Sequence, residues 1–184
     1  MSFVASLSQK NTSMTSVLRL YPQIAEAISM LSEYVMRSDD VQFSRAEREL
    51  IATYVSDLNG CDYAARTHQA TAEAEGMDAA VFAPLLKDIE LAPLEARLKP
   101  VLNYVKILTL RPAEITQAEV DAVFNAGWDE KSFHFATMVC GMFGLYNRIL
   151  LGYGISNTDE FYRESGRRLA ENGYLPVASS ASGS

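Results

Sequence analysis

The chain has 184 residues, of which 48% are hydrophobic, so it is long enough to bury one sizeable core and short for two independent domains. Its formal net charge is −7 and no stripe of lysine and arginine occurs, which argues against a nucleic-acid-binding surface. We expect a cytoplasmic protein, because neither an apolar run of about eighteen residues nor a leader-like opening occurs and the two cysteines form no secreted disulfide framework.

Apolar residues recur at helical spacing along the chain, while strict alternation of apolar and polar residues is scarce. This pattern predicts an all-α fold, a single-domain helical bundle. We expect residues 1–13 to form a loose N-terminal arm, residues 14–172 the helical domain and residues 173–184 a flexible C-terminal tail, because both ends are polar and poorly patterned.

Local signals delimit the helices of the first half. Pro22 suits the first turn of a helix, where its missing N–H costs nothing. Ser44 with Glu47 three residues later predicts a capping box, and Asn59-Gly60 is typical of a helix end. The predicted helices are 22–35, 44–58, about 61–75 and 79–86.

The second half carries the same kinds of signal. Thr116 and Glu119 repeat the capping-box spacing, and Gly127 is placed to end the short helix that they open. The predicted helices are 98–110, 116–126, about 130–152 and about 159–171. The helix over 130–152 is apolar on several sides, so we expect it in the core or between subunits.

One short motif carries most of the chemical information. Cys61 is predicted at a helix N-terminus, where unpaired amides and the helix dipole favour the reactive thiolate. His68 faces nearly the same side of that helix, about 10 Å further along its axis, so a direct hydrogen bond between the two is not expected. Ala64 lies four residues before His68, at the position closest to the imidazole.

Several stretches of the chain, spread between residues 44 and 152, carry a family resemblance. They are Ser44–Ala52, Val55–Tyr63, Leu102–Thr109, Ile115–Val120 and Tyr146–Gly152. The chain resembles the carboxymuconolactone decarboxylase and alkyl hydroperoxidase D superfamily, and more closely its branch of peroxidase-related enzymes. The resemblance implies an alkyl hydroperoxidase D-like helical bundle that assembles as a homo-oligomer, a trimer or a hexamer.

The redox members of that family carry Cys-x-x-Cys-x-x-x-His, with a glutamate twelve residues before the first cysteine. Cys61, His68 and Glu49 match the first cysteine, the histidine and the glutamate, but Ala64 stands in place of the second cysteine. The resemblance therefore implies a thiol-dependent peroxidase with antioxidant activity, in which Cys61 reduces hydrogen peroxide or an organic hydroperoxide and His68 and Glu49 relay protons. Because Ala64 cannot form a disulfide, an external thiol or a protein reductant has to complete the cycle.

Two other functions stay open. In a non-redox enzyme like the decarboxylase side of the superfamily, His68 and Glu49 would act as acid and base on a small carboxylated or lactone substrate. Arg148 or Arg66 would then hold the substrate carboxylate. Alternatively, Ala64 records lost catalysis, and the chain is a non-catalytic oligomeric member of the family.

The remaining polar residues have both a structural and a functional interpretation. Tyr63 either donates a hydrogen bond to a bound oxyanion or simply packs, and Arg148 either binds an anion or holds helices or subunits together. We interpret His134 and Cys140 as core or interface residues, and leave open whether Cys140 approaches Cys61. We expect no cofactor and no metal site, since two cysteines and two histidines at these spacings do not readily form one.

Overall fold

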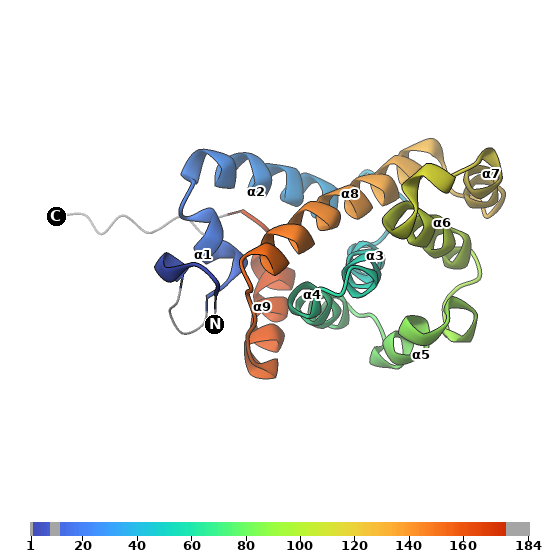
Figure 1. Ribbon diagram of the computed structural model, residues 1–184. Coiled ribbons are helices and arrows are strands. Elements are labelled where there is room, and N and C mark those ends of the chain that lie inside the picture. The colour runs from blue at the N-terminus through green and yellow to red at the C-terminus, as the bar shows by residue number, and fades with distance from the viewer. Residues whose placement is uncertain (1, 8–11, 176–184) are drawn as a thin grey trace.

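The computed structural model describes residues 2–7 and 12–175, which fold into a bundle of α-helices linked by short 3₁₀ turns (Figure 1). The described residues contain no strand, so the predicted all-α fold is confirmed. The α-helices are α1 (Met14–Leu18), α2 (Pro22–Arg37), α3 (Arg45–Leu58), α4 (Asp62–Ala74), α5 (Phe82–Lys87), α6 (Leu98–Leu110), α7 (Gln117–Asn125), α8 (Glu130–Gly152) and α9 (Asp159–Asn172). The 3₁₀ helices are η1 (Ala5–Leu7), η2 (Ala79–Val81), η3 (Ile89–Leu91) and η4 (Pro112–Glu114).

The predicted capping signals set the helix boundaries. Pro22 occupies the first turn of α2. The Glu47 backbone amide donates a hydrogen bond to the Ser44 hydroxyl at 3.1 Å, and the Ser44 backbone amide donates one to the Glu47 carboxylate at 2.7 Å. These two bonds complete the capping box of α3. The Thr116 capping box opens α7 in the same way. Each cap provides partners for amides that have none inside the helix, which is why these helices begin at the predicted residues.

The helices that hold the site lie at the centre of the bundle. α3 and α4 pack side by side, α9 packs along α4, and α8 runs across α3 (Figure 1). The α4–α9 contact is close at Gly166, where an added Cβ would lie 2.6 Å from the Ala70 Cβ. The end of α9 is thereby brought to the side of the α3–α4 pair.

Helix α8 is the long apolar helix expected from the sequence. By length and composition α8 could cross a membrane, but half of its most apolar 18-residue stretch is buried inside the protein. Phe135, Val139 and Phe143 lie in the main core, whereas Leu145 and Leu151 are exposed. The prediction that this helix belongs to the core is confirmed, and one of its faces remains outside that core.

The buried side chains form two clusters. The larger cluster joins α2, α3, α6 and α8, and a smaller one surrounds Cys61. The smaller cluster consists of Leu7, Val17, Cys61, Tyr63, Ala64, Leu150, Ile155 and Tyr162. Leu7 belongs to the stretch expected as a loose arm, and its side chain is only 4% exposed. The first residues of the chain therefore help to cover the motif cysteine.

The expected C-terminal tail is described only as far as Leu175, and residues 176–184 lie outside the described residues. Gly173 follows α9 with a positive φ of 73°, a conformation that favours glycine. This turn directs Tyr174 back toward the bundle, where its backbone amide donates to Glu33 at 2.7 Å.

Candidate active site

A buried carboxylate–imidazole pair lies between α3 and α4. Glu49 is 3% exposed and His68 is 8% exposed, and the Glu49 Oε2 lies 2.7 Å from the His68 Nδ1. Because an ionised carboxylate can only accept, Nδ1 carries the proton in this hydrogen bond. The other ring nitrogen, Nε2, is then the one left to take up or release a proton.

Tyr174 is the third member of this group. Its hydroxyl donates to the Glu49 Oε1 at 2.6 Å and lies 3.4 Å from the His68 Nδ1. The Tyr174 and His68 rings are parallel within 1°, with their centroids 6.3 Å apart. Burial, followed by the negative charge of Glu49, raises the pKa of the Tyr174 hydroxyl well above its usual value. Tyr174 is not predictable as a site residue from the sequence, because it follows the last helix in a segment with no recognisable pattern.

A second aromatic ring, that of Phe143, also packs against the His68 imidazole. The Phe143 ring meets His68 edge to face, with the ring centroids 4.5 Å apart. One buried cation also lies near the pair. Arg48 is 1% exposed, donates to the Val35 carbonyl at 3.2 Å, and interacts electrostatically with Glu49 and Tyr174. Burial lowers the pKa of the Arg48 guanidinium. Because the interior around Arg48 is poorly hydrated, its electrostatic interaction with the pair is weakly screened.

Cys61 occupies the N-cap position of α4, as the sequence predicted, but its surroundings differ from the expectation. It is 1% exposed and lies among apolar side chains. Burial raises the pKa of the Cys61 thiol, and the backbone hydrogen bond from Ala64 offsets this only in part. The expected preference for thiolate is therefore wrong in this structure, because the desolvation of a buried charge outweighs the field of the helix terminus.

The structure brings Glu49 and His68 together and leaves Cys61 apart from them. The three residues are all described, and no hydrogen bond joins Cys61 to His68, as the spacing of two helical turns suggested. Both cysteines are free. Cys140 lies in the larger cluster, beside the Thr109 hydroxyl at 3.2 Å, and Cys61 lies in the smaller one.

The other candidate residues have structural surroundings. Tyr63 is 8% exposed and packs edge to face on Tyr162, and burial raises the pKa of its hydroxyl to about 12. Arg148 is exposed and donates to the Gly144 carbonyl at 2.7 Å. Arg66 pairs with Asp159 at 2.7 Å on the surface. His134 is exposed on α8 rather than buried in the core of the chain.

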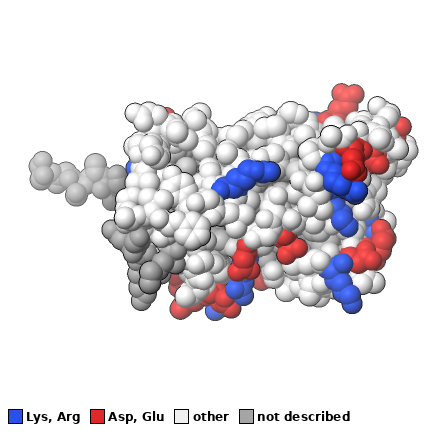
Figure 2. Space-filling view, in the orientation of Figure 1, with Lys and Arg blue, Asp and Glu red and all other residues white. Residues whose placement is uncertain are grey.

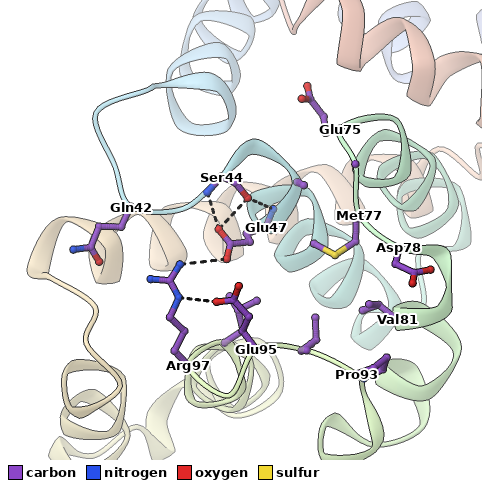
Figure 3. Close-up of a pocket in the computed structure, with 14 residues that line it drawn as sticks. Gln42, Ser44, Glu47, Glu75, Met77, Asp78, Val81, Pro93, Glu95 and Arg97 are labelled. Carbon is purple, nitrogen blue, oxygen red and sulfur yellow. Dashed lines mark hydrogen bonds and ion pairs between the residues drawn. The ribbon is translucent and has the colours of Figure 1, made fainter.

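A groove of about 570 Å³ lies elsewhere, between the start of α3, the end of α4 and the segment before α6 (Figure 3). Its polar lining is mainly acidic, and its one arginine, Arg97, lies 3.2 Å from Glu95 and 3.8 Å from Glu47. Neither Cys61 nor the Glu49–His68 pair lines this groove. Because the thiol and the histidine pair lie outside the groove, we assign the candidate active site to the pair and not to the groove.

The described residues hold no cluster of metal-ligating side chains. Within residues 2–7 and 12–175, no group of three or more histidine, cysteine or acidic side chains is placed to hold a metal ion. The chemistry that the described side chains themselves offer is proton transfer at His68, oriented by Glu49 and Tyr174, and thiol chemistry at Cys61.

The protein is a helical bundle with a buried glutamate–histidine pair and a cysteine at the N-cap of the histidine helix. Comparisons with known proteins show what this arrangement is similar to. Residues 22–96 match the carboxymuconolactone decarboxylase family model. A search of the curated proteins finds no match.

Similar solved structures agree with the family match. A peroxidase-related protein from Ralstonia eutropha JMP134, described as an alkylhydroperoxidase AhpD core, is 22% identical with a TM-score of 0.74 over 82% of this chain and 78% of that one. A peroxidase-related protein from Silicibacter sp. TM1040 is 26% identical, with a TM-score of 0.72 over 80% and 78%. A putative antioxidant defence protein AhpD from Agrobacterium tumefaciens is 19% identical, with a TM-score of 0.67 over 77% and 95%. The family match over residues 22–96 and the shared fold support a relationship to the carboxymuconolactone decarboxylase and alkyl hydroperoxidase D superfamily.

Proposed function

We propose that this protein is a thiol-dependent peroxidase that reduces hydrogen peroxide or an organic hydroperoxide. The observation that carries the proposal is the buried hydrogen bond of 2.7 Å between Glu49 on α3 and His68 on α4, the helix that Cys61 caps. The solved structures described as peroxidase-related support it. Cys61 is the nucleophile in this proposal, and His68 with Glu49 moves protons, through an intervening water because the residues make no direct contact.

The reaction balances without a second cysteine. The Cys61 sulfur attacks one oxygen of the hydroperoxide, the O–O bond breaks, and the departing oxygen takes a proton by way of His68. The products are an alcohol, or water from hydrogen peroxide, and a sulfenic acid at Cys61. Two external thiols then reduce the sulfenic acid to the thiol, forming one disulfide and one water.

The buried state of Cys61 predicts a slow enzyme at neutral pH. Because its thiol pKa is raised, the thiolate fraction at pH 7 is smaller than that of a free cysteine, and the rate should climb as the pH rises. The proton shuttle then serves to remove the thiol proton as well as to deliver one to the leaving oxygen.

The test is peroxide consumption in the presence of excess dithiothreitol, measured for the wild type and two matched variants. Cys61→Ser should abolish consumption above the rate of dithiothreitol alone. Cys140→Ser should keep it, because Cys140 is a free, buried cysteine in the other cluster. Consumption that persists in Cys61→Ser contradicts the proposal.

A second function is favoured by one observation: the Glu49–His68 pair is complete without Cys61. In a non-redox enzyme like the decarboxylases, His68 would transfer the proton on a small carboxylated or lactone substrate. Arg66 and Arg148 are exposed on the surface and engaged with other groups, so they do not support the expected carboxylate contact. Turnover of a lactone or β-keto acid that survives Cys61→Ser and is lost in His68→Asn would establish this function in place of the first. A protein inert in both assays would support the non-catalytic interpretation.

The proposal includes a homo-oligomer. The surface over α1, α2 and α8 is largely free of charged side chains (Figure 2). The same helices expose large apolar side chains: on α2 and beside it Tyr21, Ile24, Met30, Leu31 and Tyr34, and on α8 Leu145 and Leu151. Such a face is typical of an interface, and we propose that a trimer or hexamer buries it.

Light scattering coupled to gel filtration tests the assembly. The expected mass is a multiple of 20.3 kDa, and Ile24→Asp should lower it, because a charge placed in a buried apolar contact is costly. A monodisperse monomer at micromolar concentration contradicts the assembly. We also propose a cytoplasmic location, which the two unpaired cysteines support.

A further inference from the structure

We propose that Tyr174 is a positioning residue of the Glu49–His68 pair, brought to the site by the segment that follows α9. The proposal rests on the proposed function for its catalytic consequence, and on the contacts of the described residues for the positioning itself. It assigns a role to a residue from outside the cysteine–histidine motif.

Both carboxylate oxygens of Glu49 are hydrogen-bonded. Its two carboxylate oxygens have different donors: Oε2 faces the His68 Nδ1 at 2.7 Å, and Oε1 accepts the Tyr174 hydroxyl at 2.6 Å. Two donors at the two oxygens fix the rotation of the carboxylate. Glu49 then holds the Nδ1 proton of His68, and Nε2 is the nitrogen available for proton transfer.

Hydrogen bonds anchor the segment that carries Tyr174. The Arg37 guanidinium donates to the Leu169 and Ala170 carbonyls at 3.1 and 3.0 Å, and it pairs with Glu75 at 3.2 Å. Glu33 accepts the Tyr174 backbone amide at 2.7 Å. The last turn of α9 is thus tied to α2 and α4, which confines the hydroxyl to its place beside Glu49.

The turn that precedes Tyr174 is tight at Gly173. Gly173 has a φ of 73°, and an added Cβ would lie 2.5 Å from the Glu33 Oε2. The positive φ favours glycine, and an added Cβ would also displace the Glu33 carboxylate that accepts the Tyr174 amide. A substitution at Gly173 would displace Tyr174 while leaving its hydroxyl intact, which provides a second and independent perturbation.

The primary experiment does not depend on activity. The chain has two histidines, and the exposed His134 serves as an internal reference for His68. In ¹⁵N NMR spectra of the untagged wild type, we expect a protected proton on the His68 Nδ1. In Tyr174→Phe, which keeps the ring but removes the hydroxyl, that proton should exchange with water roughly 10- to 100-fold faster, the loss expected when a charged acceptor loses a donor.

The control is Tyr34→Phe, because the Tyr34 side chain is 58% exposed and lies away from the pair, against Phe135. It should leave the Nδ1 proton unchanged. Gly173→Ala should accelerate the exchange as Tyr174→Phe does. An Nδ1 signal in Tyr174→Phe that matches the wild type, in position and in exchange rate, overturns the proposal.

A second readout concerns catalysis. If the protein consumes peroxide as proposed, Tyr174→Phe should lower kcat about tenfold with little change in KM, and should alter the pH profile, because the hydroxyl acts on proton transfer through Glu49. An unchanged pH profile with a lowered rate would contradict positioning and indicate a general structural effect. Absence of peroxidase activity in the wild type would refute the proposed function alone, since the NMR result stands without it.

Discussion

Gly166 offers the sharpest test of how the bundle is packed. An alanine there would place its Cβ 2.6 Å from the Ala70 Cβ and 2.8 Å from backbone atoms of Ala70 and Thr71. Ordinary contacts begin near 3.4 Å, so α9 would have to move away from α4 by about 0.8 Å. Backbone atoms of α4 cannot rotate aside as a flexible side chain can.

The expected magnitude follows from two opposing effects. Overpacking a close contact costs roughly 1–3 kcal/mol, and the rigid neighbours of Gly166 favour the upper part of that range. Alanine in a helix interior gains about 1 kcal/mol over glycine. We therefore expect Gly166→Ala to lower the free energy of unfolding by about 1–2 kcal/mol.

Urea denaturation at one fixed protein concentration measures this change, because self-association would otherwise alter the apparent stability. Gly141→Ala is the matched control: Gly141 is an exposed helical glycine of α8, and nothing lies within 4 Å of its added Cβ. It should raise the free energy of unfolding by up to about 1 kcal/mol. A Gly166→Ala protein as stable as Gly141→Ala would refute the close α4–α9 contact.

Three further predictions follow from single residues. Iodoacetamide should alkylate folded Cys61 more slowly at pH 7 than the unfolded chain, with a rate that still climbs above pH 9, because burial raises its thiol pKa; a midpoint below about 8.5 would contradict that burial. Ser44→Ala should lower the free energy of unfolding by about 1 kcal/mol in urea, through loss of the α3 capping box, and an unchanged midpoint would show that the cap is dispensable. Glu49→Gln should lower the pKa of Tyr174 while leaving it above about 10, because the negative charge is removed and the burial remains; ¹³C NMR of the tyrosine ring checks this, and an unmoved pKa would mean that Glu49 does not act on the hydroxyl.

The sequence was most informative where the signal is local. Local patterns predicted helix boundaries that the structure has: Ser44 with Glu47, Pro22, and the long apolar run of α8. They could do so because caps and helical periodicity depend on residues only a few positions apart. The short helix α1 and the 3₁₀ turns η1, η3 and η4 were not predicted, since a few residues carry little periodicity, whereas η2 lies within the helix predicted over 79–86.

The candidate site depends on contacts between distant residues. The spacing within the motif and the family resemblance pointed to Glu49 and His68, but no local pattern brings Tyr174 to a glutamate 125 positions earlier. The same holds for Cys61. A helix N-terminus favours thiolate in isolation, whereas Leu7, Val17 and Leu150 come from three separate segments to bury this one.

The fold and the proposed chemistry of this protein depend on different observations. Similar solved structures share the helical bundle, and the family match over residues 22–96 supports the relationship to the superfamily. The peroxidase proposal depends on whether a buried thiol, lacking the second cysteine of the motif, can still reach peroxide with the help of the Glu49–His68 pair. Ala64, which stands at the position of the second motif cysteine, is 2% exposed and packs in the same cluster as Cys61. That position therefore supplies no second thiol to Cys61.

Trapping of a sulfenic acid tests this central claim most directly. The protein is treated with one equivalent of hydrogen peroxide and a sulfenic-acid-trapping diketone, and mass spectrometry compares Cys61 with Cys140, the other free and buried cysteine. We predict adduct at Cys61 and not at Cys140, reduced at least about tenfold in Glu49→Gln. Equal labelling of both cysteines, or none at Cys61, would contradict the proposed role of the pair in activating this thiol.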